Sequence, residues 1–228
     1  MKKLSILIAL TVMTTLGYGQ VKQDRNVSSF SSIEVSGAFK VYLRMGDKSA
    51  VTVVADEEYI DRITTKVEND ILEVDLDEEW WDWGNKYGDA EIYITLTSVK
   101  DLEFSGACVV VTKNTLRGTA IEIEASGASK IEASISCSSL TLDLSGATKA
   151  TLDGKCTKVN IDASGACAIY AADLQTESMS MDVSGASKAE VFVTKRLMVD
   201  ASGASKVLYK GDPSITKDVS GASSITKM

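Results

Sequence analysis

Apolar and polar residues alternate one by one along most of the chain, which is the pattern of half-buried β-strands. Clear cases are Leu140 to Leu144 and Ala189 to Val193, where every second residue is apolar. β-Branched residues are frequent, and glycine recurs too often for a helix of ordinary length. The pattern therefore predicts an all-β protein made of short strands.

A repeat of about nineteen residues centred on Ser-Gly-Ala runs through the C-terminal half. The tripeptide begins at Ser36, Ser105, Ser126, Ser145, Ser164, Ser184, Ser202 and Ser220. The last seven copies are 18 to 21 residues apart. Segments of this size cannot bury their own apolar faces, so they stack into a parallel β-solenoid with strands about 4.8 Å apart. One repeat per coil is the preferred arrangement, and two repeats per larger coil is the alternative.

The tripeptide itself has the chemistry of a turn. Glycine reaches positive φ without steric cost, alanine fits a crowded corner, and the serine hydroxyl can cap the turn. Eight copies of one serine, none of them within Gly-x-Ser-x-Gly, are not expected to be nucleophiles.

An acidic residue precedes each repeat serine by two positions: Glu34, Glu103, Glu124, Asp143, Asp162, Asp182, Asp200 and Asp218. Stacked coils would align these acids in a column. The column is either a solvated face, offset by a nearby column of Lys130, Lys149, Lys188 and Lys206, or a calcium-binding column, which needs several acids converging on one point.

Residues 20–100 hold one early repeat copy and a set of longer strands. The expected strands are Phe39 to Met45, Val51 to Ala55, Ile63 to Glu68, Ile71 to Leu76 and Ala90 to Leu96. Asn69 and Asp70 are expected to form a tight turn between two of them. We interpret this region as an irregular N-terminal β cap on a solenoid formed by residues 101–228.

The first nineteen residues have the three-part pattern of a secretory signal. Lys2 and Lys3 precede an apolar run from Leu4 to Leu16, and small residues follow at Gly17 and Gly19. The run is too short for a membrane helix, which needs about 20 apolar residues, so we expect export without a transmembrane anchor. The periplasm, the cell surface and the medium are all open as destinations.

Composition excludes several kinds of chemistry. The chain has no histidine, which removes Ser-His-Asp and Cys-His catalysis and histidine metal sites. It has 32 acidic and 24 basic residues, so nucleic acid is not an expected partner. No cofactor, metal site or catalytic set is predicted, although paired carboxylates for glycoside cleavage stay open.

All three tryptophans lie in one acidic segment, which suggests a ligand site. Trp80, Trp81, Trp83 and Asp82 could hold a sugar ring, or the tryptophans could simply close the side of the sheet.

The cysteines fall at repeat positions. Cys137 and Cys156 each lie eleven residues after a repeat serine, so they are expected to be neighbours, as a disulfide or as two stacked thiols. Cys108 and Cys167 would lie too far apart to bond, and no CxxC spacing indicates zinc.

The signal-like start, the block Ile33-Glu-Val-Ser-Gly-Ala-Phe-Lys-Val and the later Ser-Gly-Ala-Ser-Lys copies resemble the head GIN domain family of putative autotransporter adhesins from Bacteroidetes-type bacteria. The resemblance implies a right-handed parallel β-helix without a recognised catalytic set, and a role in adhesion.

Three functional hypotheses follow. The leading one is a non-enzymatic extracytoplasmic adhesion or binding module whose partner is a glycan or another cell-surface component. The first alternative is a carbohydrate-active β-helix enzyme, a lyase or glycosidase, that uses carboxylates. The second is a scaffold that forms oligomers through an open C-terminal coil near Ser220.

Overall fold

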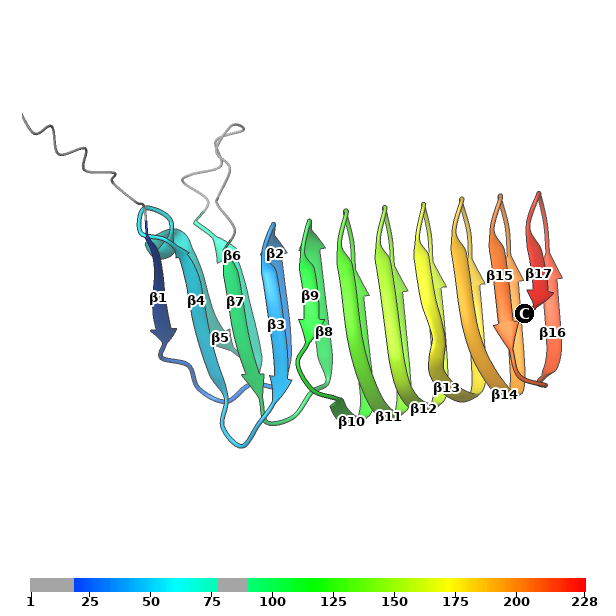
Figure 1. Ribbon diagram of the computed structural model, residues 1–228, viewed down its shortest axis with the longest axis horizontal. Helices are drawn as coiled ribbons and strands as arrows, with labels where there is room; N and C mark the ends of the chain where they lie inside the picture. Colours follow the sequence, from blue (N-terminus) through cyan, green and yellow to red (C-terminus); the bar gives the residue numbers. More distant parts are fainter. Residues whose placement is uncertain (1–18, 78–89) are drawn as a thin grey trace, which may run out of the picture.

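The computed structural model describes residues 19–77 and 90–228 and shows a β-solenoid of about 7 turns (Figure 1). The first strands are β1 (Gln20–Arg25), β2 (Ser32–Gly37), β3 (Lys40–Met45), β4 (Ala50–Asp56), β5 (Ile63–Glu68), β6 (Ile71–Leu76), β7 (Glu91–Leu96), β8 (Asp101–Gly106) and β9 (Val109–Thr112). The later strands are β10 (Leu116–Ala125), β11 (Lys130–Leu144), β12 (Lys149–Ala163), β13 (Ala168–Val183), β14 (Lys188–Ala201), β15 (Lys206–Lys210), β16 (Ser214–Val219) and β17 (Ser224–Lys227). A short 3₁₀ turn, η1 (Ile60–Arg62), precedes β5.

Each coil contains one repeat, because equal repeat positions of consecutive copies are paired. In β11 and β12 the parallel register places Leu142 beside Ile161 and Asp143 beside Asp162, nineteen residues apart. The alternative of two repeats per coil is wrong. The short strands expected around Leu140 to Leu144 and Ala189 to Val193 are parts of the longer strands β11 and β14.

Each coil contributes to two stacked sheets, and the side chains between the sheets form the core. The first sheet, here called the acid sheet, contains β5, β6, β2, β8, β16 and the C-terminal parts of β10 to β14. The second sheet contains β1, β4, β7, β3, β9, β15, β17 and the N-terminal parts of β11 to β14. Inward columns are apolar and closed to solvent, as in Leu140, Val159, Met179 and Leu197.

The early repeat copy is inserted out of sequence order. β2 and β3 lie between β6 and β7 on one side and β8 and β9 on the other, which Figure 1 shows as blue strands beside green ones. Ser36 is thereby paired with Ser105, although 69 residues separate them in the chain. β4 and β1 extend the second sheet in antiparallel pairing, and β5 does the same for the acid sheet; these three strands at the N-terminal end are here called the cap. Asn69 and Asp70 both have positive φ, as expected for the tight turn between β5 and β6.

The Ser-Gly-Ala corner requires glycine at each copy. Gly165 has φ +97°, and a Cβ at this position would lie 2.5 Å from the carbonyl oxygen of Gly146 in the preceding coil. The hydroxyl that closes the turn is not that of the repeat serine. It belongs to the residue three positions later: Ser187 Oγ, for instance, donates to the Ser184 carbonyl at 3.0 Å.

The two ends of the solenoid differ. Among the described strands, β16 pairs only with β14 and β17 only with β15, so the last coil has one free edge on each sheet. In this coil, two inward columns end in a lysine. Lys217 is paired with Val199 of the preceding coil. Lys227 is paired with Tyr209, which is itself paired with Val191. Charges at inward positions of an edge strand oppose further pairing, because a neighbouring coil would have to bury them.

Candidate functional site

Nine carboxylates form one continuous ladder on the outer face of the acid sheet. The paired residues, from the N-terminal end, are Glu73, Glu34, Glu103, Glu124, Asp143, Asp162, Asp182, Asp200 and Asp218. The sequence predicts eight of them, and Glu73 is added because β6 lies beside β2. The column arises because each acid stands between two inward positions of its strand, and these positions are apolar at every copy except Lys217, so strand alternation turns every acid outward.

Shallow depressions follow this ladder along the solenoid. One of about 590 Å³ is lined by Glu34, Glu73 and Glu103, together with Lys66. A second, of about 280 Å³, shares Glu103 with the first. A third, of about 830 Å³, shares Asp143 with the second and reaches Asp218. Because neighbouring depressions share lining residues, they form one acid-lined groove.

Partial burial and mutual repulsion favour protonation of these carboxyls. Desolvation, and then the charges of Glu103, Glu73 and Asp101, raises the pKa of Glu34. The pKa of Glu124 is raised by desolvation and by four neighbouring acids, with Glu103 the strongest of them. The pKa of Asp143 rises for the same two reasons. Glycoside cleavage by paired carboxylates uses one carboxyl with a raised pKa as the acid and a second one that stays ionised. The resolved shifts along this ladder all have the same direction.

The lysines expected to offset the acids lie elsewhere. Lys130, Lys149, Lys188 and Lys206 stand after the Ser-Gly-Ala corner, on the second sheet, and their column is interrupted by Ala168. Lys130 pairs with Glu132 and Lys188 with Glu190, at 2.6 Å each. Within residues 19–77 and 90–228, none of the nine ladder acids forms a salt bridge. The expectation of a compensating lysine column is therefore wrong.

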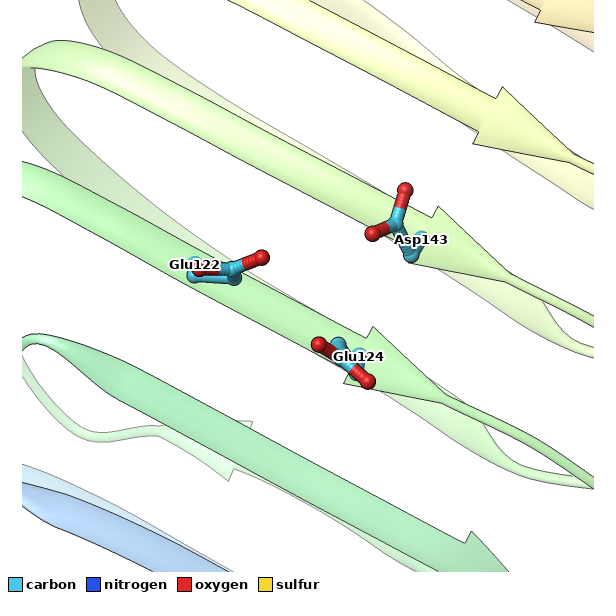
Figure 2. Close-up of side chains that lie close together, drawn as sticks. All are labelled: Glu122, Glu124 and Asp143. Carbon is cyan, nitrogen blue, oxygen red and sulfur yellow. The ribbon is translucent and has the colours of Figure 1, made fainter.

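One part of the ladder brings three carboxylates together (Figure 2). One ligand oxygen from each of Glu122, Glu124 and Asp143 lies within 4.8 Å of the others. The side chains point to solvent from two adjacent strands. Calcium takes about six to eight oxygen ligands, so three outward carboxylates would leave most of its coordination sphere to water. This cluster alone does not define a metal site.

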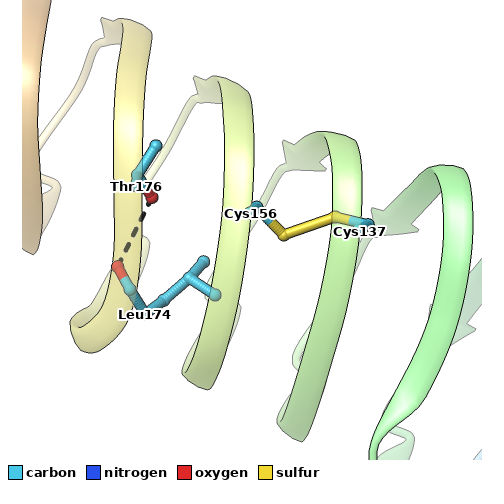
Figure 3. The surroundings of a disulfide bond; sticks show 4 residues. All are labelled: Cys137, Cys156, Leu174 and Thr176. Atoms are coloured by element: carbon cyan, nitrogen blue, oxygen red, sulfur yellow. Dashed lines mark hydrogen bonds between the residues drawn. A yellow bond between two sulfur atoms is a disulfide. The ribbon is translucent and has the colours of Figure 1, made fainter.

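Cys137 and Cys156 form a disulfide that joins adjacent coils (Figure 3). The two cysteines are directly opposite each other in the pairing of β11 with β12, and their Cα atoms are 4.8 Å apart. Of the two arrangements that the sequence left open, the structure has the bonded one. Cys108 and Cys167 are free and buried, and each takes the place that Ser187 has in its own coil, three residues after the repeat serine. Burial raises the pKa of both thiols.

The predicted sugar-binding residues Trp80, Trp81, Asp82 and Trp83 lie outside the described residues. In the sequence, their segment lies between β6 and β7. In the described parts of the chain, no helix has the length and apolar character needed to cross a membrane.

The fold and the groove define a class: a solenoid repeat protein that presents one long column of acidic side chains. More specifically, the chain belongs to the family described as putative auto-transporter adhesin, head GIN domain, whose model matches residues 29–213. The resemblance seen in the repeats is thus confirmed.

Solved structures show the same fold. A putative adhesin from Bacteroides fragilis is 19% identical, with a TM-score of 0.87 over 93% of this chain and 98% of its own. A putative lipid binding protein from Parabacteroides distasonis is also 19% identical, with a TM-score of 0.70 over 92% and 96% of the two chains. A putative adhesin from Parabacteroides merdae is 14% identical, with a TM-score of 0.64 over the same shares. No curated protein matches this chain. At these identities the likeness concerns the fold.

Proposed function

We propose that this protein is a non-enzymatic adhesion or binding module that acts outside the cytoplasm. The observation that carries the proposal is membership of the adhesin family, combined with a surface that repeats from coil to coil. A repeating surface offers the same contacts many times, which suits multivalent attachment to a polymer or a cell surface. A catalytic centre instead needs a single asymmetric arrangement.

Two further features support a location outside the cytoplasm. The Cys137–Cys156 disulfide is of the kind that persists in oxidising compartments. The first nineteen residues have the pattern of a cleaved export signal. N-terminal sequencing of the protein from its native cells should find Gln20 first. An intact N-terminus on protein recovered from the cytoplasm would contradict this location.

The expected partner is a glycan or another cell-surface component, and Trp80, Trp81, Asp82 and Trp83 are proposed as contact residues. Binding is measured on a glycan array and on isolated cell-surface fractions. Replacement of the three tryptophans by alanine should weaken binding if they hold a sugar ring. Unchanged binding would limit the tryptophans to a packing role without affecting the proposed function.

The rival function is a carbohydrate-active enzyme, favoured by the acid-lined groove alone. A reducing-sugar assay on the glycans that bind separates the two functions. Bond cleavage that is lost on Asp162→Asn, in a variant that still binds the glycan, would overturn the non-enzymatic proposal. Retention of intact glycans by the wild-type protein supports it.

A further inference from the structure

A cavity of about 440 Å³ lies on the outer face of the second sheet, near the cap. Its strands are ordered β1, β4, β7, β3 and β9. The volume falls within the range of about 300 to 1,000 Å³ that is usual for small-molecule sites. Short side chains of β4, namely Ala50, Thr52 and Val54, line its floor. We call this cavity the tyrosine pocket.

Two stacked tyrosines form one wall of the pocket. Tyr42 and Tyr93 are paired across β3 and β7, with ring centroids 4.8 Å apart and planes inclined by 31°. Both hydroxyls donate to Glu91, Tyr42 at 3.5 Å and Tyr93 at 2.5 Å, and this contact is the main reason why the pKa of Tyr93 rises to about 12. The short contact with Glu91 restrains the ring of Tyr93, which is 39% exposed and stands beside the small residues of β4.

Three cations line the same pocket. Lys22 comes from β1, Arg44 from β3, and Lys113 from the residue after β9. The Lys113 ammonium lies 3.9 Å from the Tyr42 ring centroid, and Arg44 Nε donates to Thr95 Oγ1 at 3.1 Å. In the described parts of the chain, none of these cations has a carboxylate partner. The pocket therefore concentrates positive charge in a protein whose formal net charge is −8.

The two carboxylates that border the pocket are already bound to hydroxyl groups. Glu91 accepts from both tyrosines, and Asp24 accepts from Thr52 Oγ1 at 2.6 Å. Neither lines the cavity. The free hydrogen-bonding capacity of the pocket is therefore mainly donor capacity, from the remaining guanidinium N–H groups of Arg44 and from two ammonium groups.

We propose that the tyrosine pocket binds an acidic sugar, with its ring against Tyr93 and its anionic group held by Arg44 and Lys113. A sugar presents C–H groups that pack on an aromatic face, and a carboxylate or sulfate matches the guanidinium fork. Lys22 faces the pocket from the β1 side and can contact a second acidic residue of the same polymer. This inference rests on the proposed binding function and names the partner class: an acidic polysaccharide.

The test is calorimetric titration of the mature protein with three oligosaccharides of equal length. Oligogalacturonate carries carboxylates, a sulfated dextran oligomer carries sulfates, and a maltooligosaccharide is neutral. We expect binding of at least one acidic oligomer, no measurable binding of the neutral one, and weakening as salt is added. The two acidic arms identify the anionic group. Arg44→Gln and Tyr93→Leu should each lower the affinity about tenfold.

A matched control lies on the same sheet in an internal coil. Tyr170 lies near Lys149 and Lys188, whose ammonium groups are 5.1 and 5.4 Å from its ring centroid, but Lys188 is paired with Glu190. Tyr170→Leu should leave binding unchanged. Circular dichroism and thermal melting show whether each variant is folded.

Equal binding of neutral and acidic oligomers, or wild-type affinity in folded Arg44→Gln and Tyr93→Leu, would overturn the inference. Failure of both acidic oligomers to bind would do the same. If the protein still binds array glycans or surface fractions in any of these cases, only the tyrosine pocket is rejected. If it binds none of them, the proposed function fails as well.

Discussion

Replacement of one ladder acid by its amide should stabilise the protein at neutral pH. Glu124 is the most informative choice, because it stands between Glu103 and Asp143 in the column and two residues from Glu122. Glu124→Gln keeps the size and direction of the side chain while removing its charge. The wild-type carboxylate has no salt-bridge partner in the described parts of the chain, so the substitution removes repulsion without breaking an attractive pair.

The magnitude follows from the spacing of the ladder. Two unit charges about 4.8 Å apart repel by about 0.9 kcal/mol in water, so two column neighbours amount to about 1.7 kcal/mol. The Debye length at physiological ionic strength is about 8 Å, and exposed charges interact weakly, which reduces the expected gain to about 1 kcal/mol.

The gain should depend on pH in a defined direction. Burial, and then the charges of neighbouring acids, raise the pKa of Glu124 in the folded protein above its ordinary value of 4.5. A carboxyl with a raised folded-state pKa favours the fold below its unfolded pKa, and this contribution is lost as pH rises through the folded pKa. The variant and the wild type should therefore have similar stability near pH 3.5, and the variant should be more stable at pH 7.

Urea unfolding of the two proteins at pH 3.5 and 7, each in low and high salt, measures the effect without adding ionic denaturant. Glu132→Gln is the matched control, because Glu132 is paired with Lys130 at 2.6 Å, and this partner lowers its pKa. The control should lose stability at pH 7 instead of gaining it. A Glu124→Gln variant that is no more stable than wild type at pH 7, or whose gain persists at pH 3.5 and in 1 M salt, would refute the repulsion argument.

Three further predictions concern the solenoid itself. Gly165→Ala should destabilise the fold by about 2 to 4 kcal/mol in urea unfolding, because φ is +97° and the new Cβ meets the backbone of the preceding coil. Cys137→Ser, which removes the disulfide, should cost about 3 kcal/mol, whereas Cys167→Ser should be tolerated because other coils carry serine or threonine at that buried position. Lys217→Val combined with Lys227→Val should cause concentration-dependent association in analytical ultracentrifugation, because the last coil then offers apolar inward positions to a second copy.

The end-coil variant has its own control in Lys155→Val with Lys158→Val. These two lysines are exposed on β12, an internal coil whose strand is paired on both sides, so the same loss of charge should leave the protein monomeric. Equal association of both double variants would attribute the effect to reduced charge. Association of the wild-type protein through its last coil would show that the two lysines do not protect that edge.

The regular part of the structure could be predicted because a repeat fixes register. Once the copies around Ser126, Ser145 and Ser164 stack, every offset from the serine becomes a column, and this predicts both the acid ladder and the contact between Cys137 and Cys156. The prediction that the repeat serine, such as Ser184, closes the turn with its hydroxyl is wrong. From the sequence, either serine of Ser-Gly-Ala-Ser could hydrogen-bond to the turn. The backbone path shows that the second serine, such as Ser187, points inward and donates to the backbone carbonyl of the first serine, Ser184.

The N-terminal region could not be predicted to the same depth because no repeat fixes its register. The sequence predicts most of the strand bounds, including β5 and β6 to the residue. It carries no signal that β2 would be inserted between β6 and β8 and β3 between β7 and β9, or that β4 would run antiparallel to β7. The stacking of Tyr42 on Tyr93 depends on that insertion, since 51 residues separate the two tyrosines in the chain.

The difference between the repeated coils and the irregular N-terminal region also determines where specific recognition can arise. A repeat that places the same residue at each coil produces a surface whose positions are chemically alike, as along the ladder from Asp143 to Asp218. A ligand gains many equal contacts there but has no single preferred register. A unique site needs neighbours that differ, and the second sheet obtains them at the cap, where β1 and β4 bring Lys22 and short side chains beside Tyr93. If the acid ladder and the tyrosine pocket act together, the internal coils supply many equivalent contacts along the solenoid, and the tyrosine pocket beside the cap supplies selectivity.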